Sequence, residues 1–152
     1  MKITPIAEML YQSNLIESEL SGQALFDAIR AWDYLSDKSE LNVDDVLLVH
    51  YNLMENLNPR IAGRFRNIQV SVGGRLGANP NDVSGLISEL LKIVPKNWEN
   101  VKQWHIDFEH IHPFEDGNGR VGRIILLWHL LKNKLPVQVI YNRDVEEYYE
   151  WF

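Results

Sequence analysis

The chain has 152 residues, of which 45% are hydrophobic and 24% are charged, and this length suffices for one globular domain with a sizeable core. Fifteen Lys and Arg against 21 Asp and Glu give a net charge of −6, which argues against binding DNA or RNA through a phosphate-neutralising surface. Because cysteine is absent, disulfides, thiolate nucleophiles and cysteine-ligated zinc are excluded. The start of the chain has no signal-peptide stretch and no apolar run is long enough to span a bilayer, so we expect a cytoplasmic protein with no membrane partner.

Helical periodicity dominates the chain, and the first two helices with a clear apolar face are predicted between residues 22 and 57. Apolar side chains recur at helical spacing after Gly22, and again after Asn42, a residue type that often caps a helix start. The predicted inward positions are Leu25, Ala28, Ile29, Trp32 and Leu35, followed by Val46, Val49, His50, Leu53 and Leu57.

The pattern changes from helical to alternating after residue 63. Residues 64–72 alternate apolar and polar side chains and lead into Gly73 and Gly74, which is typical of a β-hairpin. Since a lone hairpin is only marginally stable in water, we expect it to lie against the helices.

Three further helices are predicted after the hairpin. One begins with Asn79 as N-cap and ends at Pro95, and another covers residues 98–111. The first of these presents Val83, Leu86, Ile87, Leu90, Leu91 and Val94 on one face. The last, residues 120–132, is apolar on every side, which is typical of a helix surrounded by others. The sequence therefore predicts a mainly all-α bundle around a buried central helix.

The C-terminal residues 142–152 are predicted to form a short helix that packs back on the bundle. Glu146 to Glu150 are interpreted as a solvated face of that helix.

The loop before the central helix carries residues suited to binding an anion. Gly117 and Gly119 flank Asn118, so backbone N–H groups can converge there, and the start of the helix adds unpaired donors and a positive dipole end. Arg120 and Arg123 lie in the first turn and can reach the oxygens of a polyphosphate. This is how an acidic protein can bind ATP.

Two other side chains in the same loop suit group transfer. Asp116 offers a carboxylate for Mg²⁺, with water and phosphate oxygens as the other ligands. His112 has an ordinary pKa that suits proton abstraction near pH 7, although a loop histidine can also serve only as a helix cap.

Two competing motifs are weighed against this interpretation. Residues 117–122 match the dinucleotide fingerprint G-x-G-x-x-G, but a helix and a Pro loop precede them instead of a strand. His105, His110 and His112 stand near Glu109, but their spacing does not fit two zinc ligands on one helical turn. His105 is instead expected to face the core with a hydrogen-bond partner, as are His50 and His129.

The stretch HPFEDGNGRVGR, residues 112–123, resembles the signature H-x-F-x-[DE]-G-N-G-R-x-x-R of the Fic/Doc family, with every fixed position filled. Residues 63–72 also resemble the hairpin flap of that family, and the helices around a central helix resemble its fold. The resemblance covers most of the chain. It implies one Fic domain over residues 1–152, with a flap at 64–77 and a catalytic loop and helix start at 112–123.

The resemblance implies a protein adenylyltransferase, an enzyme that transfers AMP from ATP to a hydroxyl side chain of a target protein and releases pyrophosphate. It implies that His112 deprotonates the hydroxyl and that Asp116 holds Mg²⁺. Phe114 would anchor the loop. The implied anion hole is Gly117, Asn118 and Gly119, with Arg120 on the phosphates and Arg123 on the γ-phosphate. The flap residues Ile68, Gln69, Val70, Ser71 and Val72 would dock an extended segment of the target by strand addition.

A second motif lies near the N-terminus. Residues 13–18, SNLIES, resemble the inhibitory motif [ST]-x-x-x-E-[GN] of the family, except that Ser18 replaces the usual Gly or Asn. The resemblance implies an N-terminal inhibitory helix region, residues 1–20, in which Ser13 and Glu17 act on Arg123. Glu17 would pair with Arg123 and deny it to the γ-phosphate. The alternative is that Glu17 is a solvated acid on a helix surface.

Other functions stay open at the level of sequence. They are removal of AMP with Glu17 as the base, transfer of another phosphate-containing group, and a nucleotide-binding or protein-binding module without turnover. The sequence does not define the target, the modified residue type, the adenine contacts, self-modification or assembly into a homo-oligomer.

Overall fold

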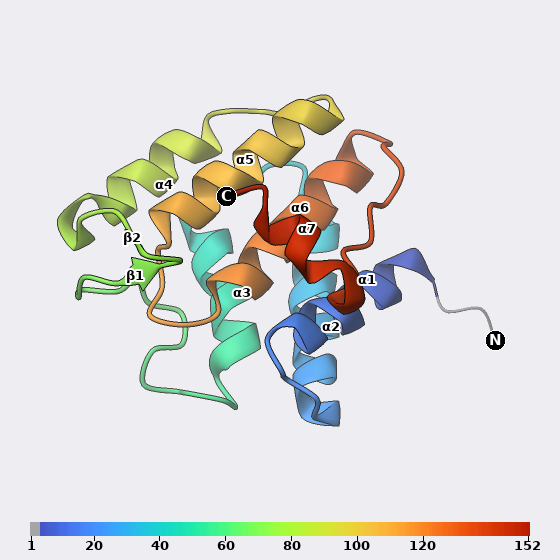
Figure 1. Cartoon of the computed structure of the whole chain (residues 1–152), viewed down its shortest axis with the longest axis horizontal. Coiled ribbons are helices and arrows are strands. Elements are labelled where there is room, and N and C mark those ends of the chain that lie inside the picture. The colour runs from blue at the N-terminus through green and yellow to red at the C-terminus, as the bar shows by residue number, and fades with distance from the viewer. Residues whose placement is uncertain (1–3) are drawn as a thin grey trace.

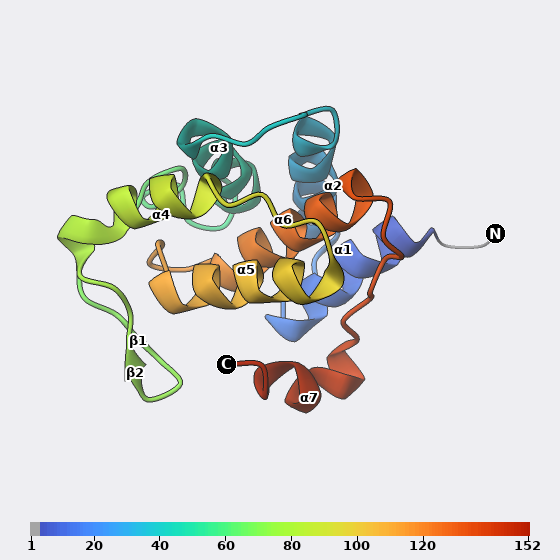
Figure 2. The same ribbon diagram turned by 90° about the horizontal axis from the view of Figure 1, so that it is seen from above.

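Helix α6 (Asn118–Lys132) lies at the centre of the structure, a computed structural model that describes residues 4–152. Residues 121–130 of this helix are buried without interruption, because its side chains are apolar nearly all round. Four helices pack against α6: α1 (Pro5–Ile16), α2 (Gly22–Ser36), α3 (Val43–Met54) and α5 (Trp98–Ile111). Figure 2 shows α1 and α5 on one side of α6 and α2 and α3 on the other. The predicted mainly all-α bundle around a central helix is confirmed.

Local sequence explains the start of α3, and most of its predicted inward positions are buried. Asn42 accepts a hydrogen bond from the backbone of Asp45, whose carboxylate accepts one from the backbone of Asn42. Ile29 and Leu57 were expected to face inward, but both are exposed. Leu57 lies beyond the end of α3, and Ile29 lies off the stripe through which α2 packs.

The helix expected after Asn79 is shorter than predicted. Residues 80–82 form one turn of 3-10 helix, and α4 (Val83–Leu91) ends before Pro95. Leu86 and Val94 are exposed. The reason is that α4 packs on its neighbours through one stripe of Val83, Ile87 and Leu90.

The predicted hairpin is also shorter than the alternation of residues 64–72 suggested. Within residues 4–152, the only strands that pair are β1 (Ser71–Val72) and β2 (Arg75–Leu76), antiparallel, across a turn in which Gly73 and Gly74 both have positive φ. The preceding residues bond elsewhere: the Arg66 N–H donates to the carbonyl of Pro113. The first half of the expected strand is therefore tied to the end of α5.

The C-terminal segment forms a 3-10 turn (Asn142–Asp144) and α7 (Val145–Tyr149), which lies in front of α6 in Figure 1. The short helix is confirmed, but its interpretation as a solvated face is wrong for Tyr148, which is buried. Within residues 4–152, no helix combines the length and apolarity needed to cross a membrane. The first three residues of the expected inhibitory region 1–20 lie outside the described residues.

Candidate active site

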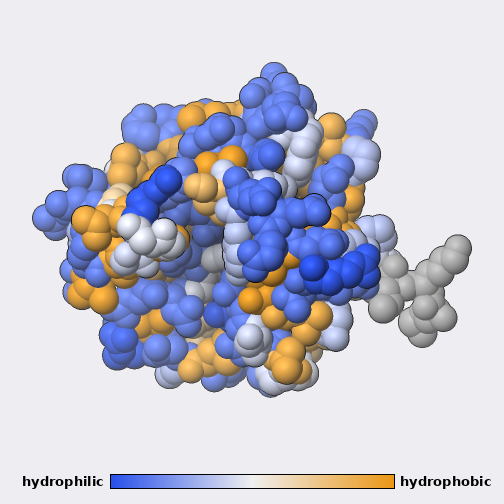
Figure 3. All heavy atoms as spheres, in the orientation of Figure 1, coloured by the Kyte–Doolittle hydropathy of each residue, from blue (hydrophilic) through white to orange (hydrophobic). Residues whose placement is uncertain are grey.

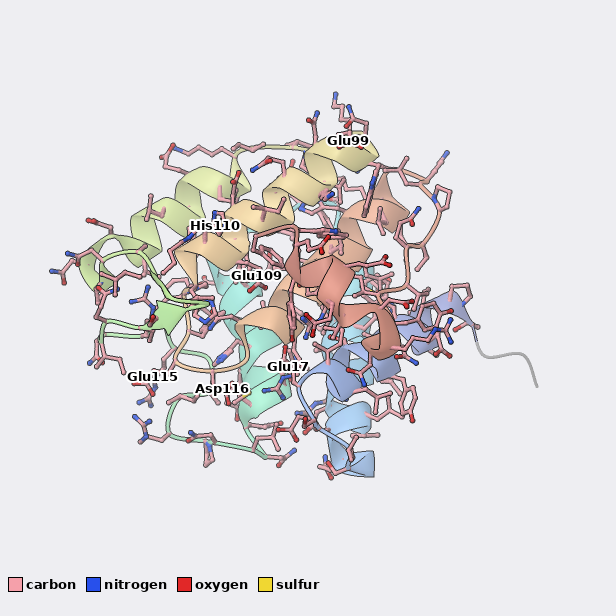
Figure 4. All side chains as sticks on the ribbon, viewed as in Figure 1. Glu17, Glu99, Glu109, His110, Glu115 and Asp116 are labelled. Carbon is pink, nitrogen blue, oxygen red and sulfur yellow. The ribbon has the colours of Figure 1, made fainter. Side chains whose placement is uncertain are left out.

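A cavity of about 600 Å³ opens where five parts of the fold meet. These are the end of α1 at Glu17, the hairpin at residues 72–76, the last turn of α5, the loop and helix start at 112–123, and the C-terminal residues 148–152. Figure 3 shows the surface hollowed between the hairpin and the C-terminal segment. Glu17, Glu109 and Asp116 surround this cavity from three separate segments (Figure 4).

His112 ends α5 and lines the cavity. Its backbone is left-handed, with φ of 53°, while its N–H still donates to the carbonyl of Phe108 at 3.0 Å. Nδ1 lies 3.3 Å from the carbonyl oxygen of Glu109, and a proton on Nδ1 leaves Nε2 able to accept one. Burial lowers the pKa of His112, so the imidazole is neutral at pH 7. A neutral imidazole is the form that a general base requires.

The loop after His112 is held by Phe114 and Asn118. The Phe114 ring is fully buried and stacks on His50 at 3.8 Å. The Asn118 amide accepts from the Phe114 N–H and donates to the Phe114 carbonyl, both at 2.8 Å. Gly117 adopts φ of 88°, and a Cβ there would meet Met54 Sδ at 3.1 Å. The side chain of Asn118 thus fixes the loop, and only its backbone N–H remains for an anion.

We expect Phe114→Ala to lower the free energy of unfolding by about 3–5 kcal/mol, because it empties a fully buried ring position. Urea denaturation measures this loss, and Phe26→Ala at an exposed position is the matched control. Equal losses at the two positions would contradict the anchoring interpretation.

Asp116 precedes the start of α6 and faces solvent. Its Oδ1 accepts from the Gly117 N–H at 2.8 Å, and the side chain is 69% exposed at the cavity. One exposed carboxylate beside an anion cradle is a suitable donor set for Mg²⁺, which keeps water and phosphate ligands. Within residues 4–152, His, Asp and Glu form no group of three or more arranged to hold a metal ion.

Arg123 is buried on α6 one turn after the loop, and its guanidinium is held from α1. Nε donates to Ser13 Oγ at 2.8 Å, and Nη2 donates to the Ser13 carbonyl at 3.2 Å and to Glu17 Oε1 at 2.6 Å. A Cβ on Gly119 would lie 2.5 Å from Glu17 Oε1, so glycine is required for the carboxylate to sit there. The pairing of Glu17 with Arg123 that the resemblance implied is present in the structure.

The backbone conformation of Ser18 accounts for the Gly or Asn that the family's inhibitory motif usually has at this position. Its φ is 58°, in the left-handed region that Gly and Asn adopt most readily, and it follows directly on Glu17 at the end of α1. Serine adopts this conformation less readily than Gly or Asn does.

Two groups that sequence reasoning missed face Arg123 from other elements. Tyr148 Oη lies 3.4 Å from Arg123 Nη1 and 2.6 Å from His105 Nε2. Glu109 is buried on α5, and its Oε1 has no hydrogen-bond partner within residues 4–152. Burial of the carboxyl raises the pKa of Glu109 to about 7, although Arg123 acts in the opposite direction. Burial by itself would lower the pKa of Arg123, but Tyr148, Glu17 and Glu109 together raise it.

The pKa of Glu109 leads to a pH-dependent stability. Between its ordinary pKa of 4.5 and the folded value of about 7, the folded protein keeps a proton that the unfolded chain has lost. The free energy of unfolding therefore falls as pH rises through this window.

We expect Glu109→Gln to remove that dependence. The free energy of unfolding of the variant minus that of wild type should then be larger at pH 8 than at pH 4.5, by up to about 3 kcal/mol. Urea denaturation of both proteins at the two pH values measures the difference, and other titrating groups cancel in the comparison. The same difference at both pH values would contradict the assignment.

The structure places Arg120 and most of the predicted flap outside the cavity lining. The Arg120 guanidinium is buried, 3.5 Å from Met54 Sδ and 3.9 Å from Asp116 Oδ1. Of the five flap residues, only Val72 lines the cavity. The predicted contact of Arg120 with phosphate stays a prediction, because in this structure the side chain lies beneath the loop.

The remaining core histidines were expected to have hydrogen-bond partners, and within residues 4–152 His50 has partners at both ring nitrogens, whereas His105 has one at Nε2 and none at Nδ1. His50 accepts from the Gly63 N–H and donates to the Asp116 carbonyl, while His105 contacts Tyr148 Oη. His129 differs, because its Nε2 has no partner within residues 4–152 and its ring packs edge-on against Trp104 and Trp128.

A helical bundle whose central helix starts at a glycine-flanked loop, with a hairpin beside the cavity, defines the Fic type of fold. The chain belongs to the Fic/DOC family, whose model matches residues 40–130. A Fic-domain-containing signaling protein from Bacteroides thetaiotaomicron superposes with a TM-score of 0.77 over 95% of this chain and 69% of its own, at 20% identity. A Fic family protein from Desulfovibrio desulfuricans also gives 0.77, over 96% and 55% of the two chains, at 24% identity.

Among curated relatives, the chain is 30% identical to the protein adenylyltransferase Fic of Aedes aegypti over 123 residues, which is 73% of this chain and 24% of that protein. It is also 30% identical to the protein of the same name in Drosophila grimshawi over 129 residues, 77% and 26% of the two chains. The chain thus spans about a quarter of the length of these relatives.

Proposed function

We propose that this chain is a protein adenylyltransferase domain that transfers AMP from ATP to a hydroxyl side chain of a target protein and is inhibited by its own Glu17. One observation carries the proposal: His112, the first backbone donors of α6 and Arg123 meet at a single cavity, where Glu17 forms an ion pair with Arg123. The names of the curated relatives support the same activity.

The proposed reaction is displacement at the α-phosphorus. His112 Nε2 takes the proton of the target hydroxyl, the hydroxyl oxygen forms a bond to the α-phosphorus, and the bond to the β-phosphate oxygen breaks to release pyrophosphate. The N–H groups of Asn118 and Gly119 and the positive end of α6 would bind phosphate oxygens, and the Gly117 N–H would join them on leaving Asp116 Oδ1. Asp116 would hold a Mg²⁺ that arrives with the nucleotide and neutralises phosphate charge. Arg123 binds the γ-phosphate.

The proposed brake is competition for Arg123. Glu17 Oε1 accepts from Arg123 Nη2, so a γ-phosphate must displace a formed ion pair before it binds there. Raw Coulomb attraction at contact is about 4 kcal/mol at an effective dielectric near 20, and desolvation offsets part of it. A net coupling of about 1–3 kcal/mol corresponds to repression of about 5–150-fold.

The target is proposed to dock as an extended strand along residues 68–72. Pairing through backbone groups positions the hydroxyl without reading much of the target sequence. The carbonyls of Ile68 and Val70 already accept hydrogen bonds, from Arg66 and from the Gly77 N–H. Within residues 4–152, the N–H groups of residues 68–70 donate to no backbone carbonyl, so these donors would carry the pairing.

ATP labelled at either the α- or the γ-phosphate tests the activity. We expect the Glu17→Gly variant to transfer α-label to protein in a lysate, and His112→Ala in the same background to lose it. γ-Label on protein would instead indicate phosphorylation. ATP binding without transfer of either label would contradict the proposed enzyme and favour a binding module.

Removal of AMP is the second candidate, because the Glu17 carboxylate lies at the cavity beside the phosphate cradle and could activate water. The labelled protein from the preceding experiment distinguishes the two roles. If wild-type protein releases AMP from it and Glu17→Gly does not, Glu17 is a base and not only a brake.

A further inference from the structure

Arg66 lies outside the cavity, yet it holds the backbone on both sides of His112. The residue is buried, with 4% of its surface exposed. Nε donates to the His112 carbonyl at 2.6 Å, and Nη2 donates to the Ile111 carbonyl at 3.1 Å. The backbone N–H of Arg66 donates to the Pro113 carbonyl at 3.0 Å. One residue thus binds three consecutive carbonyl oxygens around the left-handed His112.

The same guanidinium also closes the base of the hairpin. Nη1 donates to the Ile68 carbonyl at 2.8 Å, and Nη2 donates to the Ala78 carbonyl at 2.6 Å. Ile68 begins the strand segment proposed for docking, and Ala78 follows β2. Arg66 therefore joins both ends of the hairpin to the end of α5.

The chemistry of this contact is unusual for a buried cation. Among residues 4–152, no carboxylate lies within ion-pair distance of Arg66; its four side-chain bonds go to carbonyl oxygens. Two of these carbonyls belong to the end of α5, where carbonyl groups lack helical partners and the dipole favours a cation. A planar guanidinium with several fixed donors suits this arrangement, and an ammonium does not.

We propose that Arg66 is a positioning residue for His112. Arg66 fixes the left-handed turn at His112 and with it the orientation of the imidazole, and it makes this orientation depend on a closed base of the hairpin. The inference rests on the proposed role of His112 as the base. A left-handed non-glycine residue persists only where surrounding contacts determine it, and Arg66 supplies contacts on three successive peptide groups.

Charge gives a supporting argument. Burial lowers the pKa of His112 most, and the positive charge of Arg66 lowers it further. Glu17 and Asp116 act in the opposite direction, and the Glu109 carboxylate lies 4.0 Å from Nδ1. Lysine at position 66 keeps the positive charge but lacks the planar guanidinium and its fixed donors. Arg66→Lys therefore distinguishes an effect of hydrogen-bond geometry from an effect of charge.

Arg66→Lys in the Glu17→Gly background is the test of positioning, with AMP transfer measured as a function of ATP concentration. We expect kcat to fall about 10²-fold, as small misplacement of a reacting group does, with little change in KM for ATP because Arg66 does not line the cavity. Arg64→Lys, an exposed arginine in the same segment, is the matched control and should keep the parent kcat. A parent kcat in Arg66→Lys, or a rise in KM that accounts for the loss, would overturn the proposal.

Gly77→Ala is the second variant, because it keeps Arg66 and adds a methyl group 2.9 Å from Nη2. If Arg66→Lys fails to fold, Gly77→Ala decides the question, and we expect the same loss of kcat from it.

An NMR measurement on nucleotide-free protein separates this proposal from the enzymatic one. We expect the imidazole resonances of His112, assigned through His112→Ala, to move in Arg66→Lys and not in Arg64→Lys. Unmoved resonances would overturn the positioning role. If no form of the protein transfers label, the proposed function fails, while this measurement still decides on Arg66.

Discussion

His112→Ala is expected to lower the rate of AMP transfer by about 10²–10⁴-fold, because it removes the group that accepts the proton of the target hydroxyl. ATP affinity should change little, since the phosphate contacts that we propose are the start of α6 and Arg123, which line the cavity, and His112 is not among them. The two readouts are label transfer from α-labelled ATP and ATP binding by calorimetry, both in the Glu17→Gly background. Retained transfer, or a matching loss of ATP binding, would contradict His112 as the base.

The same assignment predicts how the rate depends on pH. Burial lowers the pKa of His112 below its ordinary 6.5, so the imidazole is neutral at pH 7 and becomes protonated only in more acidic solution. The rate should therefore stay level near pH 7 and fall as pH drops through the lowered pKa of His112.

Glu17→Gly is expected to raise AMP transfer by about 5–150-fold, because it frees Arg123 for the γ-phosphate. Glu17→Gln retains the shape and removes the charge, so it should give most of the same increase. Label transfer at saturating target measures both variants.

Glu19→Gly is the matched control for the brake. Glu19 lies two residues further along, and its side chain makes no hydrogen bond or ion pair within residues 4–152. It should leave the rate unchanged. Equal increases in Glu17→Gly and Glu19→Gly would indicate loosening of the end of α1 and contradict competition for Arg123.

The two acids near Arg123, Glu17 and Glu109, are expected to have different roles. Glu17 reaches it from α1 and is partly exposed, whereas Glu109 approaches from α5 and is buried with a pKa of about 7. Below this pH Glu109 is mainly protonated and adds little negative charge near Arg123. The brake and the pH-dependent stability are therefore expected to be separable by Glu17→Gln and Glu109→Gln.

Much of the fold could be predicted because the signals are local. The buried helix α6 shows as a segment apolar on every side, and α5 ends before Pro113 because a residue that precedes proline avoids helical angles. The hairpin was predicted too long because alternation reports side-chain polarity. It does not report that the Arg66 N–H bonds to Pro113 instead of to a neighbouring strand.

The sequence by itself determined the anion-binding loop at residues 112–123 and the central helix, because spacing and residue type define them, whereas the pairing of Glu17 with Arg123 was implied only by the resemblance of residues 13–18 to a family motif. Only the tertiary structure decided the surroundings of Arg123 and His112. Tyr148 and Glu109 lie in stretches that are polar in the sequence, and they become buried because α7 and α5 meet over α6. Burial and the directions of donors depend on which distant segments meet, and no local pattern specifies that.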